Sequence, residues 1–286
     1  MITPSLGPDS APSTGIVAWW DRWESDNAHR TWIAIIARWR AIGGRGLAWG
    51  MALNFFLAVL PVVVIFTSLL ASIHRARSYG DLLASSLGLR GHASLVVRNT
   101  FARANGHTFA VLGVSGFLFL ACGLDLATAG QQTFAKGWGR LPDTGWRSVV
   151  RGMRWFFAMA VSTVLTQWLA FATKDRTAKA VVVDASIFLV VQFGLWLITP
   201  RLLVDKSLSL RELIPGAIVG ALVSAAFRIA SVFVLPGSFG WYADAFGPAG
   251  VVMAVVSWYV LMSFGWVFIA IAGGILAERR RPMQVL

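Results

Sequence analysis

The chain has 286 residues, of which 57% are hydrophobic and 13% are charged, and its net charge is +12. A soluble domain has roughly 25% charged residues, so this composition excludes a soluble enzyme, a disordered chain and a secreted disulfide scaffold. It is the composition of an integral membrane protein. The basic residues are spread between apolar runs, where they meet anionic lipid headgroups, so we expect the bilayer and no nucleic acid as partner.

The first 46 residues are polar and rich in tryptophan, and we expect them to form a cytoplasmic segment. Within it, residues 27–42 place Trp32, Ile35 and Trp39 at helical spacing, with arginines between them. That pattern predicts an amphipathic helix lying on the membrane surface. The first apolar run begins too far from Met1 for a cleaved signal peptide, which predicts an uncleaved anchor.

Six long apolar runs follow within residues 47–277. Each approaches or exceeds the roughly 20 residues that a membrane-spanning helix needs, and lipid requires backbone groups to be bonded internally. The expected fold class is therefore all-α, a polytopic bundle of six transmembrane helices. The predicted spans cover residues 47–73, 108–135, 155–173, 180–200, 213–235 and 248–277.

The segments between the spans carry further expectations. Residues 74–107 contain two short apolar runs and predict a helical connection on the outer surface, and residues 278–286 form a basic cytoplasmic tail. Pro200 and Pro236 are expected to end the fourth and fifth spans. Three tryptophans near span ends are expected at the membrane interface: Trp49, Trp155 and Trp241.

Lys and Arg counts predict the orientation of the bundle. Of the 25 basic residues, 16 fall on the side of the two termini, eight fall on the other side, and Arg228 lies within a span. Cytoplasmic loops carry the excess of Lys and Arg. We therefore expect both termini in the cytoplasm of a bacterium and the protein in its inner membrane.

Three charged side chains lie inside the predicted spans: Asp125, Asp184 and Arg228. Each is energetically expensive in lipid unless it is paired or hydrated. At 1.5 Å per residue, Asp184 and Arg228 lie roughly 6 and 10 Å from the outer ends of their spans, and Asp125 lies on the order of 25 Å down. The hypothesis is an Arg228–Asp184 pair with Asp125 separately placed.

Polar side chains extend these charges into stripes at helical spacing. One hypothesis is a polar cavity through the bundle, and the alternative is that the stripes only form hydrogen bonds between helices. The candidate site residues are Asp125, Thr128, Gln132, Thr163, Gln167, Asp184, Gln192, Ser224 and Arg228, with Thr166 and Ser231 on the same faces.

Small residues recur on the fifth span as Gly216-x-x-x-Gly220 followed by Ser224. This spacing lets helix backbones approach closely, either within the chain or between protomers of an oligomer.

Catalytic constellations are absent from the sequence. The four histidines have no metal-site spacing, there is no phosphate-binding GxxxxGK[ST] loop, and Cys122 is the single cysteine. We expect no enzyme, no cofactor and no metal.

The order of motifs towards the C-terminus resembles the YihY/BrkB family of six-span bacterial inner-membrane proteins, which has carried a ribonuclease label. The resemblance covers residues from about 45 to 281. It rests on Ala52-Leu53 to Leu57, Pro61, Leu213-Ile214-Pro215-Gly216-Ala217, Arg228, Trp241-Tyr242, Phe246-Gly247-Pro248-Ala249-Gly250, Trp258-Tyr259, Gly273-Gly274 and Glu278–Arg281.

The chain departs from that family at two places. It has Phe246-Gly247-Pro248 where the family tends to have Tyr-Gly-Ser, and Gly273-Gly274-Ile275 where the family has Gly-Ala-Glu. The resemblance implies a divergent member, for which transport, lipid handling or envelope maintenance is compatible with the polar stripes. The leading hypothesis is a membrane protein that accommodates a small solute or lipid. The alternatives are a structural envelope protein and, last, a nuclease.

Overall fold

The computed structural model describes residues 30–73, 91, 94–95, 98–99, 108–172, 178–204 and 207–280. Within these residues the secondary structure is helical and no strand occurs, in agreement with the all-α expectation. Residues 30–41 form a short helix. Six longer helices follow: α2 (Gly44–Ile73), α5 (Thr108–Gly137), α6 (Trp146–Ala172), α7 (Ala178–Leu203), α8 (Leu210–Phe246) and α9 (Pro248–Arg280). Most of the predicted connection 74–107 lies outside the described residues.

Five of the helices in the described part of the chain are long and apolar enough to cross a membrane: α2, α5, α7, α8 and α9. This property makes the chain an integral membrane protein. The predicted third span falls on α6, which is not among the five. Its first turns carry Arg147, Arg151 and Arg154, so only its second half is continuously apolar.

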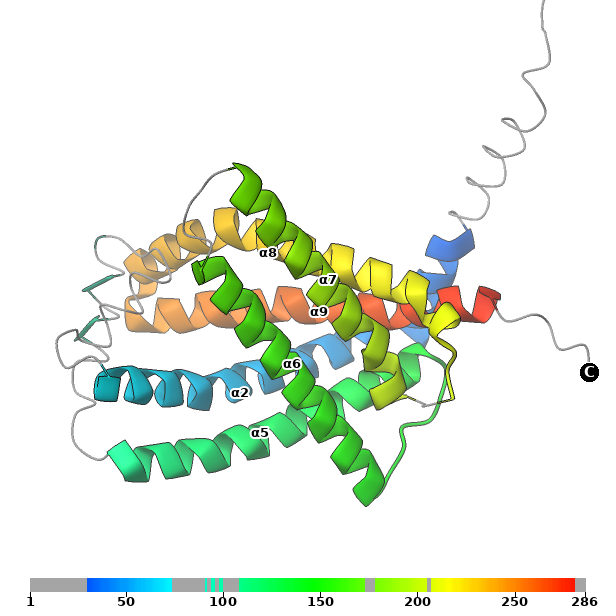
Figure 1. The fold of residues 1–286 in the computed structure, drawn as a ribbon, viewed down its shortest axis with the longest axis horizontal. Coiled ribbons are helices and arrows are strands. Elements are labelled where there is room, and N and C mark those ends of the chain that lie inside the picture. The colour runs from blue at the N-terminus through cyan, green and yellow to red at the C-terminus, as the bar shows by residue number, and fades with distance from the viewer. Residues whose placement is uncertain are drawn as a thin grey trace, which may run out of the picture.

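The helices form a bundle with two distinct ends (Figure 1). At one end, here called the terminal end, lie helix 30–41, the α5–α6 connection and the last turns of α9. At the opposite end, here called the distal end, lie Ile73 and the α8–α9 turn. Helix α9 packs against α2, α5 and α8, and α6 crosses the bundle obliquely in contact with α5 and α7.

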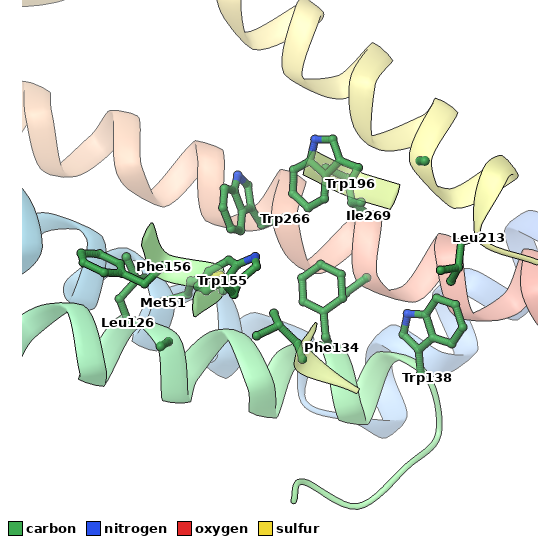
Figure 2. Close-up of a cluster of buried hydrophobic side chains, with 14 of the residues drawn as sticks. Met51, Leu126, Phe134, Trp138, Trp155, Phe156, Trp196, Leu213, Trp266 and Ile269 are labelled. Carbon is green, nitrogen blue, oxygen red and sulfur yellow. The ribbon is translucent and has the colours of Figure 1, made fainter. Parts of the chain in front are cut away.

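Aromatic side chains from five helices fill the core in the terminal half of the bundle (Figure 2). Trp266 lies at the centre of this core. Its ring makes T-shaped contacts with the rings of Trp155 and Trp196, at centroid distances of 5.7 and 4.9 Å. The expectation that Trp155 lies at the membrane interface is wrong, since the side chain is 0% exposed and its Nε1 donates to Thr199 Oγ1. Trp49 and Trp241 are exposed, as an interfacial position requires.

Glycines bring α8 within close reach of two neighbours. A Cβ atom on Gly216 would lie 2.9 Å from the Cα atom of Gly273 on α9, and one on Gly220 would lie 2.4 Å from the Trp196 ring on α7. The small-residue motif of the fifth span therefore serves packing inside the chain. Both glycines therefore pack against neighbouring helices of the same chain.

Helix 30–41 packs along the second half of α9, from its middle to its last turns. Trp32 and Trp39 stack on Phe268 and Phe264, with ring centroids 5.8 and 5.6 Å apart. Arg38 donates to both carboxylate oxygens of Glu278, at 2.7 and 3.0 Å, and to the carbonyl oxygen at the end of α5. The predicted surface helix is thus also a packing element of the bundle.

Prolines do not end the helices where the sequence suggested. Helix α8 continues through Pro236 to Phe246, and α7 continues through Pro200 to Leu203. Proline removes one backbone hydrogen bond, and in a membrane bundle the freed carbonyl is re-satisfied by local adjustments while the helix continues. The chain turns at Gly247 instead, whose φ of 59° lies in the left-handed region that favours glycine.

Candidate functional site

The predicted polar residues divide between two separate hollows in the described part of the bundle. Arg228 lines the larger hollow, called the cavity below, together with four other predicted residues: Thr163, Gln167, Gln192 and Ser224. The remaining predicted residues of α5 line a second hollow, called the groove below: Asp125, Thr128 and Gln132. Asp184 lines neither hollow and reaches the cavity through its contact with Arg228.

The cavity has a volume of about 700 Å³ and receives side chains from all six long helices. Ligand sites for small molecules have volumes of roughly 300–1,000 Å³ and are lined mainly by apolar and aromatic side chains with a few polar groups. The cavity has that character, with Trp196, Trp258 and Trp266 among the aromatic residues of its lining. Trp196 and Trp266 also belong to the aromatic core, which therefore closes the cavity towards the terminal end.

The predicted pair of intramembrane charges is confirmed. Arg228 Nη2 on α8 donates to Asp184 Oδ2 on α7 over 2.5 Å, and the two side chains are 31% and 18% exposed. The two residues lie at matching depth on adjacent antiparallel helices, which is why helical rise alone was enough to pair them. The pair cancels both formal charges and so lowers the free energy of keeping them in the bundle.

One nitrogen of Arg228 keeps unused hydrogen-bonding capacity. Its Nη1 atom is buried and has no hydrogen-bond partner among the described residues, whereas the guanidinium carbon lies 4.5 Å from the centre of the Phe188 ring. A buried N–H group without an acceptor is energetically unfavourable. An anionic or carbonyl oxygen entering the cavity would supply the missing acceptor.

Hydroxyl groups along the cavity are mostly bonded to their own helix. Thr163 donates to the Met159 carbonyl, and Ser231 donates to the Arg228 carbonyl. Ser224 differs, because its Oγ accepts the indole N–H of Trp196 over 2.8 Å and so joins α8 to α7. The side-chain amides of Gln167 and Gln192, which line the cavity, make no hydrogen bond to other described residues. These amides and Arg228 Nη1 are polar groups of the cavity to which a ligand could bond.

The groove lies between the first half of α2 and the second half of α5 and has a volume of about 360 Å³. Asp125 is exposed and has no ion-pair partner among the described residues, as the depth arithmetic predicted when it placed this carboxylate apart. Thr128 Oγ1 donates to the Leu124 carbonyl, which leaves its lone pairs available to a ligand.

Sequence reasoning missed several residues of both hollows. The aromatic lining of the cavity, including Trp196 and Trp266, carries no polar signal in the sequence. Asn54 and Thr133 of the groove were also missed. Asn54 is a polar residue within an apolar run, and Thr133 follows Gln132 on α5, so both could have been found by applying the search for polar residues to every span.

Compared with protein-family models, curated proteins and solved structures, the chain matches none of them.

Proposed function

We propose that the chain accommodates a small solute or lipid in the cavity, and that it does so as a six-span protein of a bacterial inner membrane with both termini in the cytoplasm. The observation that carries this proposal is the position of Arg228 in the cavity lining, with a buried N–H group that has no acceptor among the described residues. An unpaired guanidinium N–H donor beside an apolar, aromatic wall suits an amphiphile with a carbonyl-bearing or anionic head.

The apolar lining of the cavity favours a lipid over a polar solute as the ligand. The cavity lining is mainly apolar, and its outward-facing members include Val62, Val164 and Val232, which are exposed on the side of the bundle. A headgroup at Arg228 could leave its acyl chains against these residues. With the termini in the cytoplasm, the cavity lies towards the outer leaflet and the aromatic core closes it towards the cytoplasm.

The proposal also includes membership of the YihY/BrkB family and a topology with both termini in the cytoplasm. The motifs quoted above, above all Leu213–Ala217 with Arg228 and the Gly273-Gly274 pair, support a divergent member of the YihY/BrkB family. The 16-to-8 distribution of basic residues supports the orientation, and α6 as a sixth span would return the chain to the outer side before α7. The activity assigned here is binding or transport and not catalysis.

A structural role is the second candidate, favoured by a specific observation. The Ser224 hydroxyl is occupied by Trp196, and the hydroxyls of Thr163 and Ser231 are bonded to their own helices. If Arg228 only holds α7 to α8, as its bond to Asp184 allows, the cavity has no ligand.

Native mass spectrometry of the purified protein separates the two candidates. We expect wild type to carry a bound lipid or solute mass that Arg228→Gln loses by tenfold or more, while Arg147→Gln, an exposed arginine at the start of α6, retains it. Wild type without any adduct under conditions that preserve the fold would contradict the binding role and favour the structural one.

A further inference from the structure

The groove between α2 and α5 contains a carboxylate, Asp125, that the Arg228–Asp184 pair does not neutralise. Asp125 lies near the middle of the apolar stretch Gly113–Gly137, and no basic side chain among the described residues pairs with it. A carboxylate at membrane depth needs a counter-charge, a proton or water. The groove that Asp125 lines is the place where such a partner would lie.

Besides Asp125, four residues with oxygen-bearing side chains line the groove: Asn54, Thr128, Gln132 and Thr133. On α5, Asp125, Thr128 and Gln132 share one face at spacings of three and four residues, Thr133 lies beside Gln132, and Asn54 lines the groove from α2. Asn54 lies ten residues after Gly44 and Asp125 lies twelve before Gly137, so both lie roughly 15–18 Å from the terminal end. A carboxylate, two amides and two hydroxyls form a donor set for a hard cation.

A second observation points to an occupant. Thr133 is 1% exposed, it lines the groove, and its hydroxyl has no hydrogen-bond partner among the described residues. A buried hydroxyl without a partner is unfavourable, and a cation or its water would supply one.

The opposite wall of the groove is open. Gly46 and Gly50 of α2 line it, and no heavy atom lies within 4 Å of where a Cβ would stand on either residue. The resulting volume of about 360 Å³ holds an ion with several waters, since one water occupies roughly 30 Å³.

We propose that this groove is a Na⁺ site. The donor set carries one negative charge, so a monovalent cation leaves the site neutral, whereas a divalent cation would leave an uncompensated positive charge in a medium of low dielectric constant. Ca²⁺ sites typically use several carboxylates, and among the residues that the structure describes Asp125 is the only carboxylate lining the groove.

Binding of ²²Na⁺ to the full-length protein in detergent, with choline as the replacement cation, tests this proposal. Wild type should bind one Na⁺ per chain, Asp125→Asn should lose binding, and Asp143→Asn, a carboxylate paired with Arg151 outside the bundle core, should retain it. Thr133→Val should weaken binding at least tenfold, while Thr133→Ser, which keeps the hydroxyl, should restore it.

Thermal unfolding gives an independent readout if a variant is poorly produced. Na⁺ at ten to one hundred times its Kd should raise the unfolding midpoint of wild type by about 2–5 °C relative to choline. Equal ²²Na⁺ binding by wild type and Asp125→Asn would overturn the proposal. So would stabilisation by acid in choline with no response to Na⁺, because a proton would then be the occupant.

The cavity and the groove share no lining residue. Loss of a lipid adduct in Arg228→Gln therefore leaves the Na⁺ site untested, and loss of Na⁺ binding in Asp125→Asn leaves the lipid proposal untested. The two proposals stand or fail separately.

Discussion

At the scale of single residues, the environment of Arg228 explains why a full charge persists in an apolar bundle. Asp184 neutralises it, and the Phe188 ring lies against the guanidinium. Removing one partner of such a pair leaves an uncompensated buried charge and is strongly destabilising. Both residues are partly exposed, so solvent or lipid headgroups screen part of that effect.

Reversal of charge tests the pair directly. We expect Arg228→Asp or Asp184→Arg alone to destabilise the protein by about 3 kcal/mol or more, because each places two like charges together. The double reversal should recover most of the lost stability, as measured by the unfolding midpoint in detergent. Rescue of Arg228→Asp by Asp125→Arg and not by Asp184→Arg would show that the pairing is wrong.

The Asp184–Arg228 pair could be predicted from the sequence, whereas the burial of Trp155 could not. Asp184 and Arg228 could be paired because both are rare charges and helical rise fixes their depth. Trp155 could not be placed, because a tryptophan near a span end has the same local sequence whether its ring faces lipid or core. Its position depends on Trp266 and Thr199, which lie on helices distant in the chain.

At the scale of elements, backbone proximity fixes how α8 meets α9. Gly216 and Gly273 face each other so closely that a methyl group on Gly216 would contact the backbone of α9. Backbone atoms yield less readily than the end of a flexible side chain, so the helices would have to separate.

Alanine substitutions on α8 test this contact. Gly216→Ala should destabilise the protein by about 1–3 kcal/mol through overpacking. Gly237→Ala on the same helix has no heavy atom near its new Cβ and should be neutral or stabilising by up to about 1 kcal/mol. Comparison of the two unfolding midpoints is the measurement, and equal effects would rule out a specific contact at Gly216.

The sequence was enough to predict that each helix exists, but not the residues at which the helices end. Each predicted span corresponds to a helix, because a long apolar run has few alternatives in lipid. Pro236 misled the prediction of where α8 ends, since proline disfavours a helix locally but does not forbid one. The signal for the true turn was Gly247, one residue before Pro248, where positive φ is needed.

At the scale of the whole molecule, the number of crossings depends on α6. The helix has 27 residues and is long enough to span, but three arginines lie in its first nine positions. Such residues can remain at the cytoplasmic interface while the apolar second half enters the membrane. In the proposed topology, residue 141 would then lie in the cytoplasm and residue 179 outside.

Cysteine labelling tests this topology. In a Cys122→Ala background, Leu141→Cys, at a position 92% exposed, should resist a membrane-impermeant maleimide in intact cells and react after lysis. Lys179→Cys should react in intact cells, with access through the outer membrane provided. Labelling of both positions from the same side would show that α6 does not cross.

The cavity as a whole was only partly predictable. Its polar members could be predicted because polar groups are exceptional in spans. Its aromatic and aliphatic lining could not be told from core residues in the sequence, because it comes together only when six helices pack. The sequence also could not show that the candidate site residues belong to two hollows, because helical spacing says nothing about which helix each polar face meets. Only the helix arrangement shows that α5 turns its polar face towards α2 and away from Arg228.

Filling the cavity without removing any polar group tests its role as a binding site most directly. Ala160 lines the cavity from α6, and Val161, the next residue, is 63% exposed on the outside of the bundle. Lipid extracted from purified Ala160→Phe should fall at least fivefold per chain relative to wild type, while Val161→Phe should match wild type. Unchanged bound lipid in a folded Ala160→Phe would contradict a ligand-binding cavity.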